Sequence, residues 1–122
     1  MRLPDSDDQI VILHNPRCSK SRQGLEVLAG AGVEHQTWRY LDDPPTVDEL
    51  REIGRRLGRP PIDWLRRKEE AFRASGLDAQ AEDEALYELM ARHPKVIERP
   101  IVIRGRRAVL GRPPEAIREV LD

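Results

Sequence analysis

The chain of 122 residues has a single cysteine, Cys18, and no long apolar run. A single cysteine excludes a disulfide within the chain, so the sequence lies outside the disulfide-rich secreted class and fits a reducing compartment. No apolar stretch approaches the roughly 18 to 20 residues that span a bilayer. The first ten residues are acidic and lack the apolar centre of an export signal. We therefore expect a cytoplasmic protein that does not enter a membrane.

The sequence also lacks a strong net charge, because 21 Lys and Arg face 22 Asp and Glu, a formal charge of -1. This balance does not favour a nucleic-acid or membrane binder. The charges are nevertheless uneven, since residues 92–112 contain seven Arg or Lys and one acid, Glu98. No Cys/His cluster has metal-ligand spacing and no glycine loop is of the phosphate-binding kind, so we expect no metal and no bound cofactor.

The N-terminal apolar pattern predicts a strand, a helix and a second strand. Residues 9–14 form a short β-branched run that ends at an Asn-Pro pair, which favours a buried strand. Residues 18–32 have helical spacing, and either Ser19 or Ser21 can cap the helix start. Residues 33–41 alternate as a second strand does, and the helical crossover predicts that the two strands are parallel.

The remainder of the chain predicts helices and one hairpin. Thr46 and Glu49 have the spacing of a capping box. Residues 100–111 contain two short apolar runs around "RGRR", which favours an antiparallel hairpin. Four segments are predicted to be helical, namely residues 42–58, 62–76, 83–93 and 113–121.

This order of elements predicts an α/β protein with a four-stranded mixed sheet flanked by helices. The layout is that of the thioredoxin-like fold, with a helical insertion between an N-terminal βαβ half and a C-terminal ββα half. We expect one domain over residues 9–122 and a disordered, solvated tail over residues 1–8. The short strands and near-neutral charge favour a monomer.

Cys18 is predicted to be a reactive thiolate. At the start of a helix it faces unpaired backbone N–H groups and the positive end of the helix dipole. Arg17, Lys20 and Arg22 add positive charge nearby, and His14 ends the preceding strand. These conditions lower the pKa of a cysteine. The alternative, an inert buried thiol, is less consistent with neighbours that are Pro, Arg, Ser and Lys.

The position three residues after Cys18 is Ser21, so the dithiol motif of many redox enzymes is reduced to one thiol. A covalent intermediate on Cys18 must therefore be resolved by a thiol from another molecule, which implies glutathione or a small redox protein. A phosphatase-like cysteine would need an arginine six residues further on, and that position is Gly24. We therefore disfavour the phosphatase alternative.

Four segments resemble those of the glutaredoxin-linked arsenate reductases, a branch of the thioredoxin superfamily with a helical insertion. "HNPRCSKSR" looks like the cysteine motif of that family, "LRRKEEAF" resembles the segment with its first substrate arginine, and "RPIVI" and "LGRPPE" resemble those with the second and third. The likeness covers nearly all of the chain from Val11. "LRRKEEAF" departs from the "LRKN" form and is closer to the less characterised, arsenate-reductase-related members.

The resemblance implies a set of functional residues. Cys18 would be the nucleophile, and a cis proline before the third strand would bring Arg99 toward it. The residues implied to bind the oxyanion are Arg66 (or the adjacent Arg67), Arg99 and Arg112, and those implied to support the thiolate are His14, Ser21 and Arg22.

The implied activity is the reduction of arsenate to arsenite through a Cys18–arsenate adduct that glutathione and glutaredoxin resolve. Two alternatives remain open. One is a glutathione-dependent thiol reductase with another substrate. The other is a non-catalytic redox regulator of the same fold that binds RNA polymerase.

Overall fold

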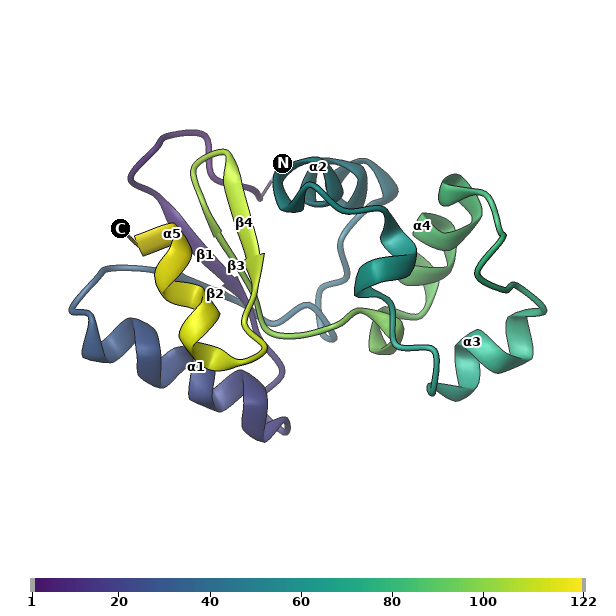
Figure 1. The fold of residues 1–122 in the computed structure, drawn as a ribbon, viewed down its shortest axis with the longest axis horizontal. Coiled ribbons are helices and arrows are strands. Elements are labelled where there is room, and N and C mark those ends of the chain that lie inside the picture. Colours follow the sequence, from purple (N-terminus) through teal and green to yellow (C-terminus); the bar gives the residue numbers. More distant parts are fainter. Residues whose placement is uncertain (1, 122) are drawn as a thin grey trace.

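The computed structural model describes residues 2–121 and contains a four-stranded sheet with helices on both faces (Figure 1). The strands are β1 (Ile10–Leu13), β2 (Gln36–Trp38), β3 (Ile101–Arg104) and β4 (Arg107–Leu110). They lie in the order β2-β1-β3-β4, with β1 parallel to β2 and antiparallel to β3, and with β3 antiparallel to β4. The predicted mixed sheet and C-terminal hairpin are thus confirmed.

The predicted helical segments are also present, most of them shorter than expected. The α-helices are α1 (Ser19–Gly30), α2 (Val47–Leu57), α3 (Glu70–Ser75), α4 (Asp83–Arg92) and α5 (Arg118–Leu121), and the 3-10 helices are η1 (Pro61–Trp64), η2 (Pro94–Val96) and η3 (Pro114–Ile117). The expected last helix is therefore divided between η3 and α5. In residues 2–121, no helix is both long and apolar enough to traverse a membrane.

The second strand is shorter than its alternating pattern suggested. Only Gln36–Trp38 pairs with β1, in a register that places Val11 opposite Gln36 and Leu13 opposite Trp38. β1 has four residues, so it can pair with no more than four of residues 33–41, and three of them are paired. The short length of the neighbouring strand therefore limits β2, which an alternating local pattern does not reveal.

The sheet is buried on both faces, which explains the continuous apolar run of β1. Successive side chains of a strand point to opposite faces. Val11 and Leu13 belong to the hydrophobic cluster shared with α2 and α4, whereas Ile10 and Ile12 belong to the cluster shared with α1 and α5. Figure 1 shows the same division, with α1 and α5 together and α2, α3 and α4 extending away from them.

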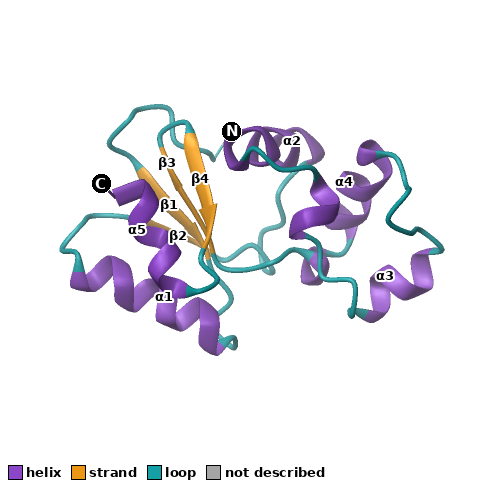
Figure 2. Cartoon of the chain, in the orientation of Figure 1, coloured by secondary structure: helices purple, strands orange, loops and turns teal. Residues whose placement is uncertain are grey.

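The helical insertion between β2 and β3 comprises α2, η1, α3, α4 and η2 (Figure 2). Its first helix begins with the predicted capping box, since the Glu49 N–H donates to Thr46 Oγ1 (3.1 Å) and the Thr46 N–H donates to Glu49 Oε1 (3.0 Å). The same helix ends at Gly58, which has a φ of 69°. Both boundaries of α2 are thus determined by local side-chain and backbone chemistry.

The structure differs from the disordered segment that we expected over residues 1–8. Leu3 is buried in the larger hydrophobic cluster, and the Arg2 guanidinium lies 4.2 Å above the Trp38 ring. That guanidinium also donates to the carbonyl oxygens of Asp43 (3.1 Å) and Pro44 (2.8 Å). Residues 2–4 are therefore part of the domain, while Met1 lies outside the described residues.

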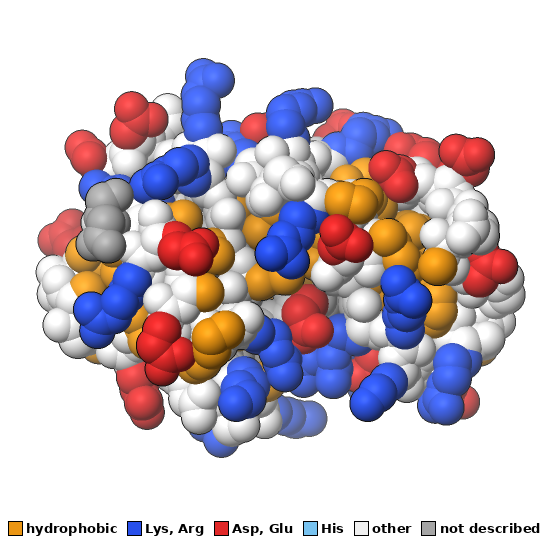
Figure 3. Space-filling view, in the orientation of Figure 1, with side chains coloured by type: hydrophobic (Ala, Val, Ile, Leu, Met, Phe, Trp, Pro, Cys, Tyr) orange, Lys and Arg blue, Asp and Glu red, His pale blue; other side chains and the backbone are white. Residues whose placement is uncertain are grey.

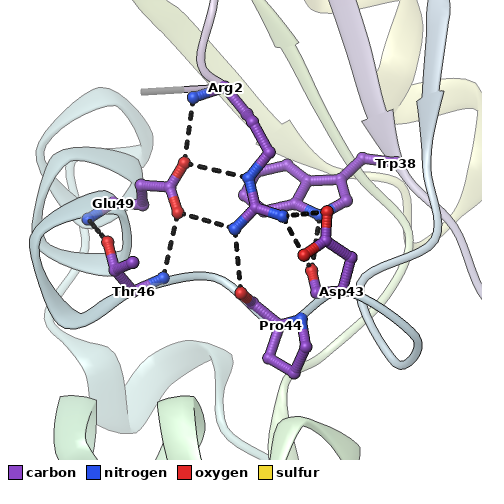
Figure 4. Close-up of polar contacts among 6 residues, drawn as sticks. All are labelled: Arg2, Trp38, Asp43, Pro44, Thr46 and Glu49. Atoms are coloured by element: carbon purple, nitrogen blue, oxygen red, sulfur yellow. Dashed lines mark hydrogen bonds and ion pairs between the residues drawn. The ribbon is translucent and has the colours of Figure 1, made fainter.

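Glu49 explains why Arg2 is held in place (Figure 4). Its side chain is 5% exposed, and a buried carboxylate is costly unless it is paired. The backbone N–H and the Nη2 of Arg2 donate to the two carboxylate oxygens at 2.9 and 2.8 Å. Burial opposes ionisation of Glu49, but the hydrogen bonds from Arg2 and Thr46 outweigh it and lower the pKa to about 2. The sequence does not reveal this long-range pair.

Candidate active site

Cys18 is itself the N-cap residue of α1, with extended backbone angles (φ -100°, ψ 123°). The expectation that Ser19 or Ser21 caps this helix is therefore wrong, because both lie within its first turn. The Cys18 side chain forms no capping hydrogen bond. The backbone N–H groups of Ser21 and Lys20 nevertheless lie close enough to favour its anion. The sulfur thus occupies the place of an N-cap oxygen.

The surroundings of Cys18 lower the pKa of its thiol. Burial alone would raise that pKa, since the side chain is partly buried. The N–H of Ser21, the positive charge of Arg99 and a side-chain hydrogen bond from Arg99 act in the opposite direction and outweigh burial. A lowered pKa increases the thiolate fraction at neutral pH, which is the form that attacks electrophiles.

His14 and Ser21 form a buried pair behind the thiol. His14 Nδ1 lies 2.7 Å from Ser21 Oγ, and the Asn15 N–H donates to the same oxygen (2.9 Å). Burial, together with the charges of Arg39 and Arg22, lowers the pKa of His14, so its ring is neutral at pH 7. His14 therefore positions the first turn of α1 through Ser21 and supplies no positive charge to the sulfur.

Arg22 contacts the loop and the first turn around Cys18 through both its backbone and its side chain. Its backbone N–H donates to the Cys18 carbonyl oxygen (3.0 Å) as part of the helix. Its Nη1 donates to the Pro16 carbonyl oxygen (2.9 Å), and the side chain is exposed. Arg22 thus braces the loop that precedes Cys18.

Close packing of a proline brings the loop before β3 against α1. The Arg99–Pro100 peptide bond is cis, as expected. A Cβ atom on Gly24 would lie 2.9 Å from Pro100 Cγ, and one on Gly111 would lie 2.7 Å from the same atom. Such separations are shorter than real Cβ contacts, so both positions require glycine. This packing also excludes the arginine that a phosphatase-like site would need at position 24.

Arg99 presents unused hydrogen-bond donors beside the thiol. Its side chain is 12% exposed, and within residues 2–121 its buried Nε and Nη1 have no hydrogen-bond partner. Buried charged donors are costly when they are left unpaired. A negatively charged oxygen held next to Cys18 would satisfy them.

The three predicted arginines meet at one carboxylate oxygen, Glu98 Oε1. Arg112 Nη1 donates to it (2.9 Å), and ion-pair distances of 3.6 and 3.9 Å join it to Arg99 Nη1 and Arg66 Nε. The Arg66 backbone N–H also donates to the Val96 carbonyl (2.7 Å), which holds the two segments side by side. Three distant parts of the chain thus form one group of guanidiniums, here called the arginine cage (Arg66, Arg99 and Arg112).

Of the two adjacent candidates in "LRRKEEAF", Arg66 is the one that reaches the cage. Its side chain is 30% exposed and also pairs with Glu69 (2.6 Å), whereas Arg67 is exposed. Sequence reasoning missed Glu98 as a member of the site. Its isolation as the single acid among seven basic residues was the available signal.

Tyr40 is a second residue that sequence reasoning missed. It follows β2 and is 1% exposed. Burial raises the pKa of its phenol to about 12, opposed by the positive charge of Arg99 and reinforced by the charge of Cys18. The phenol therefore borders the cage and stays protonated at neutral pH. The alternation of residues 33–41 gave no indication of this position.

The fold and the site together define a thioredoxin-like protein with one activated cysteine and an arginine cage. Within the described part of the chain, no group of three or more His, Cys, Asp or Glu side chains could hold a metal ion. The chain matches the ArsC family over residues 13–120 and belongs to that family.

Two relatives of this chain match it over nearly their whole length. An arsenate reductase of Neisseria meningitidis serogroup B is 41% identical over 115 residues, which cover 93% of this chain and 98% of the relative. A protein of Escherichia coli strain K12 called YfgD, whose name states no activity, is 40% identical over 115 residues that cover 93% and 97%.

A solved structure confirms the thioredoxin-like fold. An arsenate reductase from Vibrio cholerae superposes with a TM-score of 0.88 at 43% identity, and the match covers 94% of this chain and 99% of that one.

Proposed function

We propose that this protein is a cytoplasmic enzyme that reduces arsenate to arsenite, with Cys18 as its nucleophile. The observation that carries the proposal is the buried Nε and Nη1 of Arg99, which have no hydrogen-bond partner among residues 2–121 and lie beside a thiol of lowered pKa. A tetrahedral oxyanion suits the fork of donors on a guanidinium. Membership of the ArsC family and relatives named arsenate reductase support arsenate as the substrate.

In the first step the Cys18 thiolate attacks arsenic. A sulfur–arsenic bond forms, an arsenic–oxygen bond breaks, and the oxygen leaves as water with protons taken from the acidic forms of arsenate and solvent. Arsenic keeps its oxidation state. Arg99, Arg112 and Arg66 stabilise the anionic oxygens of the adduct, and such preorganised charges lower the barrier most when the site excludes water.

In the next steps two external thiols supply the electrons. Glutathione forms a bond to arsenic and displaces a second oxygen as water. A glutaredoxin thiol then attacks the glutathione sulfur, so that a disulfide forms while the electron pair of the broken arsenic–sulfur bond stays on arsenic and reduces it. Hydrolysis of the remaining arsenic–sulfur bond releases arsenite and Cys18. Ser21 stands where a resolving cysteine would be needed, so an external thiol is a chemical necessity.

The arginine cage distinguishes this proposal from a thiol reductase that acts on glutathionylated substrates. Such a substrate has no oxyanion at its reacting sulfur, so three converging guanidiniums would serve no purpose at the point of attack. The regulator alternative likewise gives the buried Arg99 donors no ligand.

The decisive measurement uses the fact that Cys18 is the only thiol in the chain. Arsenate should slow the alkylation of Cys18 by iodoacetamide, and Cys18→Ser should abolish arsenate reduction in the presence of glutathione and glutaredoxin. Sodium chloride at equal ionic strength serves as the control for the alkylation experiment. Full activity in Cys18→Ser, or equal protection by chloride, would contradict the proposal.

A further inference from the structure

An open groove adjoins the arginine cage on the side of the helical insertion. It has a volume of 730 Å³ and lies between residues 59–68 and the segments that carry Glu98 and Arg112. That volume is within the range of about 300–1,000 Å³ that is usual for small-molecule sites. Arg66 and Arg112 belong to the cage and also line the groove, as does Glu98, so the groove and the cage are continuous.

The lining of the groove is strongly basic. Five basic residues and two acidic residues line it. Arg66 and Arg112 are paired with Glu98, but Arg59, Arg67 and Lys68 are exposed, and no salt bridge of theirs is found among residues 2–121. Figure 3 shows Lys and Arg side chains gathered below the centre of the face that it presents. Three exposed cations that line one groove are therefore available to a ligand.

We infer that Arg59, Arg67 and Lys68 bind the carboxylates of an acidic small-molecule thiol that resolves the Cys18 adduct. This inference rests on the proposed function, since it needs an oxyanion adduct on Cys18. The ligand class follows from two observations. The single cysteine demands an external thiol, and the groove that leads to the cage carries uncompensated positive charge suited to carboxylates.

Charge also explains why the co-substrate needs such a site. The adduct on Cys18 is anionic, and an anionic thiol that approaches it is repelled. Cations along the path of approach offset this repulsion and raise the local concentration of the thiol. With its carboxylates at Arg59, Arg67 and Lys68, the thiol can extend its sulfur toward the cage, bond to arsenic and release one arsenic-bound oxygen as water.

The test compares two triple variants that remove the same charge. The groove variant is Arg59→Gln, Arg67→Gln and Lys68→Gln, and the control variant is Arg73→Gln, Lys95→Gln and Arg106→Gln, all at exposed positions. Steady-state arsenate reduction is measured with saturating glutaredoxin, using glutathione and its diethyl ester, which keeps the thiol but lacks the negative carboxylates. Protection of Cys18 by arsenate against alkylation is measured without any thiol donor.

The groove variant should raise the KM for glutathione about tenfold, and it should leave the KM for the diethyl ester and the protection by arsenate unchanged. The control variant should match the unmodified protein in every measurement. Three results would overturn the inference while arsenate still protects Cys18. They are an unchanged KM for glutathione in the groove variant, an equal rise of its KM for the diethyl ester, and an equal rise of the KM for glutathione in the control variant. If arsenate does not protect Cys18 against alkylation in the unmodified protein, the proposed function itself is overturned and this inference with it.

Discussion

The packing of Pro100 against α1 yields a quantitative prediction about Gly24. A Cβ atom at this position would lie 2.9 Å from Pro100 Cγ and 3.2 Å from Ile117 Cδ1. The proline ring cannot rotate away, so the loop or the helix must shift. Overpacking of this kind costs about 1–3 kcal/mol. The same α-helix contains a matched control, because a Cβ atom on Gly30 would have no neighbour within 4 Å.

Gly24→Ala and Gly30→Ala both gain helix propensity, by up to about 1 kcal/mol each. The difference between the two variants therefore isolates the clash. Unfolding entropy of about 2.1 cal/mol/K per residue over the 122 residues of the chain gives roughly 0.26 kcal/mol/K. Thermal unfolding followed by circular dichroism should place the Tm of Gly24→Ala about 4–12 °C below that of Gly30→Ala. Equal Tm values in the two variants would refute the packing of Pro100 against α1 described above.

Further predictions concern the charges. Arg99→Gln should shift the pH profile of Cys18 alkylation to higher pH. It should also slow arsenate reduction about ten- to a hundredfold, since a charged hydrogen bond contributes roughly 1.5–3 kcal/mol. Arg106→Gln is the control, and an unchanged pH profile of alkylation in Arg99→Gln would contradict this account. Glu49 has a pKa of about 2 in the folded protein against an ordinary 4.5. Its ionised carboxylate therefore adds about 3 kcal/mol to the free energy of unfolding above pH 4.5, and this contribution is lost as the pH falls toward 2. Arg2→Ala should flatten that pH dependence in urea unfolding, and a slope equal to that of the unmodified protein would show that Arg2 does not hold the carboxylate ionised.

Local sequence was sufficient for features that depend on neighbours along the chain. The capping box of Thr46 and Glu49, the Gly58 helix end and the β3–β4 hairpin involve residues within a few positions of each other, and their side-chain types specify them. The position of Cys18 at a strand-to-helix joint was predictable for the same reason. The identity of the capping residue was not, because Cys18 and the serines that follow it compete for one helix start.

Resemblance to a family pointed to Arg66, Arg99 and Arg112 as candidates, but it did not indicate how they are held. Glu98 gathers Arg66, Arg99 and Arg112 from three separate segments. No periodicity in the sequence encodes a meeting of this kind, because it depends on how the helical insertion packs beside β3.

By itself, the sequence determined the order of strands and helices and the single thiol, which is why the proposed function takes a second thiol from another molecule. Only the tertiary structure decided that Arg2 is anchored to Glu49, that Gly24 and Gly111 admit the Pro100 ring, and that basic side chains form a groove beside the cage. The physical reason is that helices, turns and caps arise from short-range backbone and side-chain preferences. Charge pairs and close contacts between distant segments exist only after the core has brought those segments together.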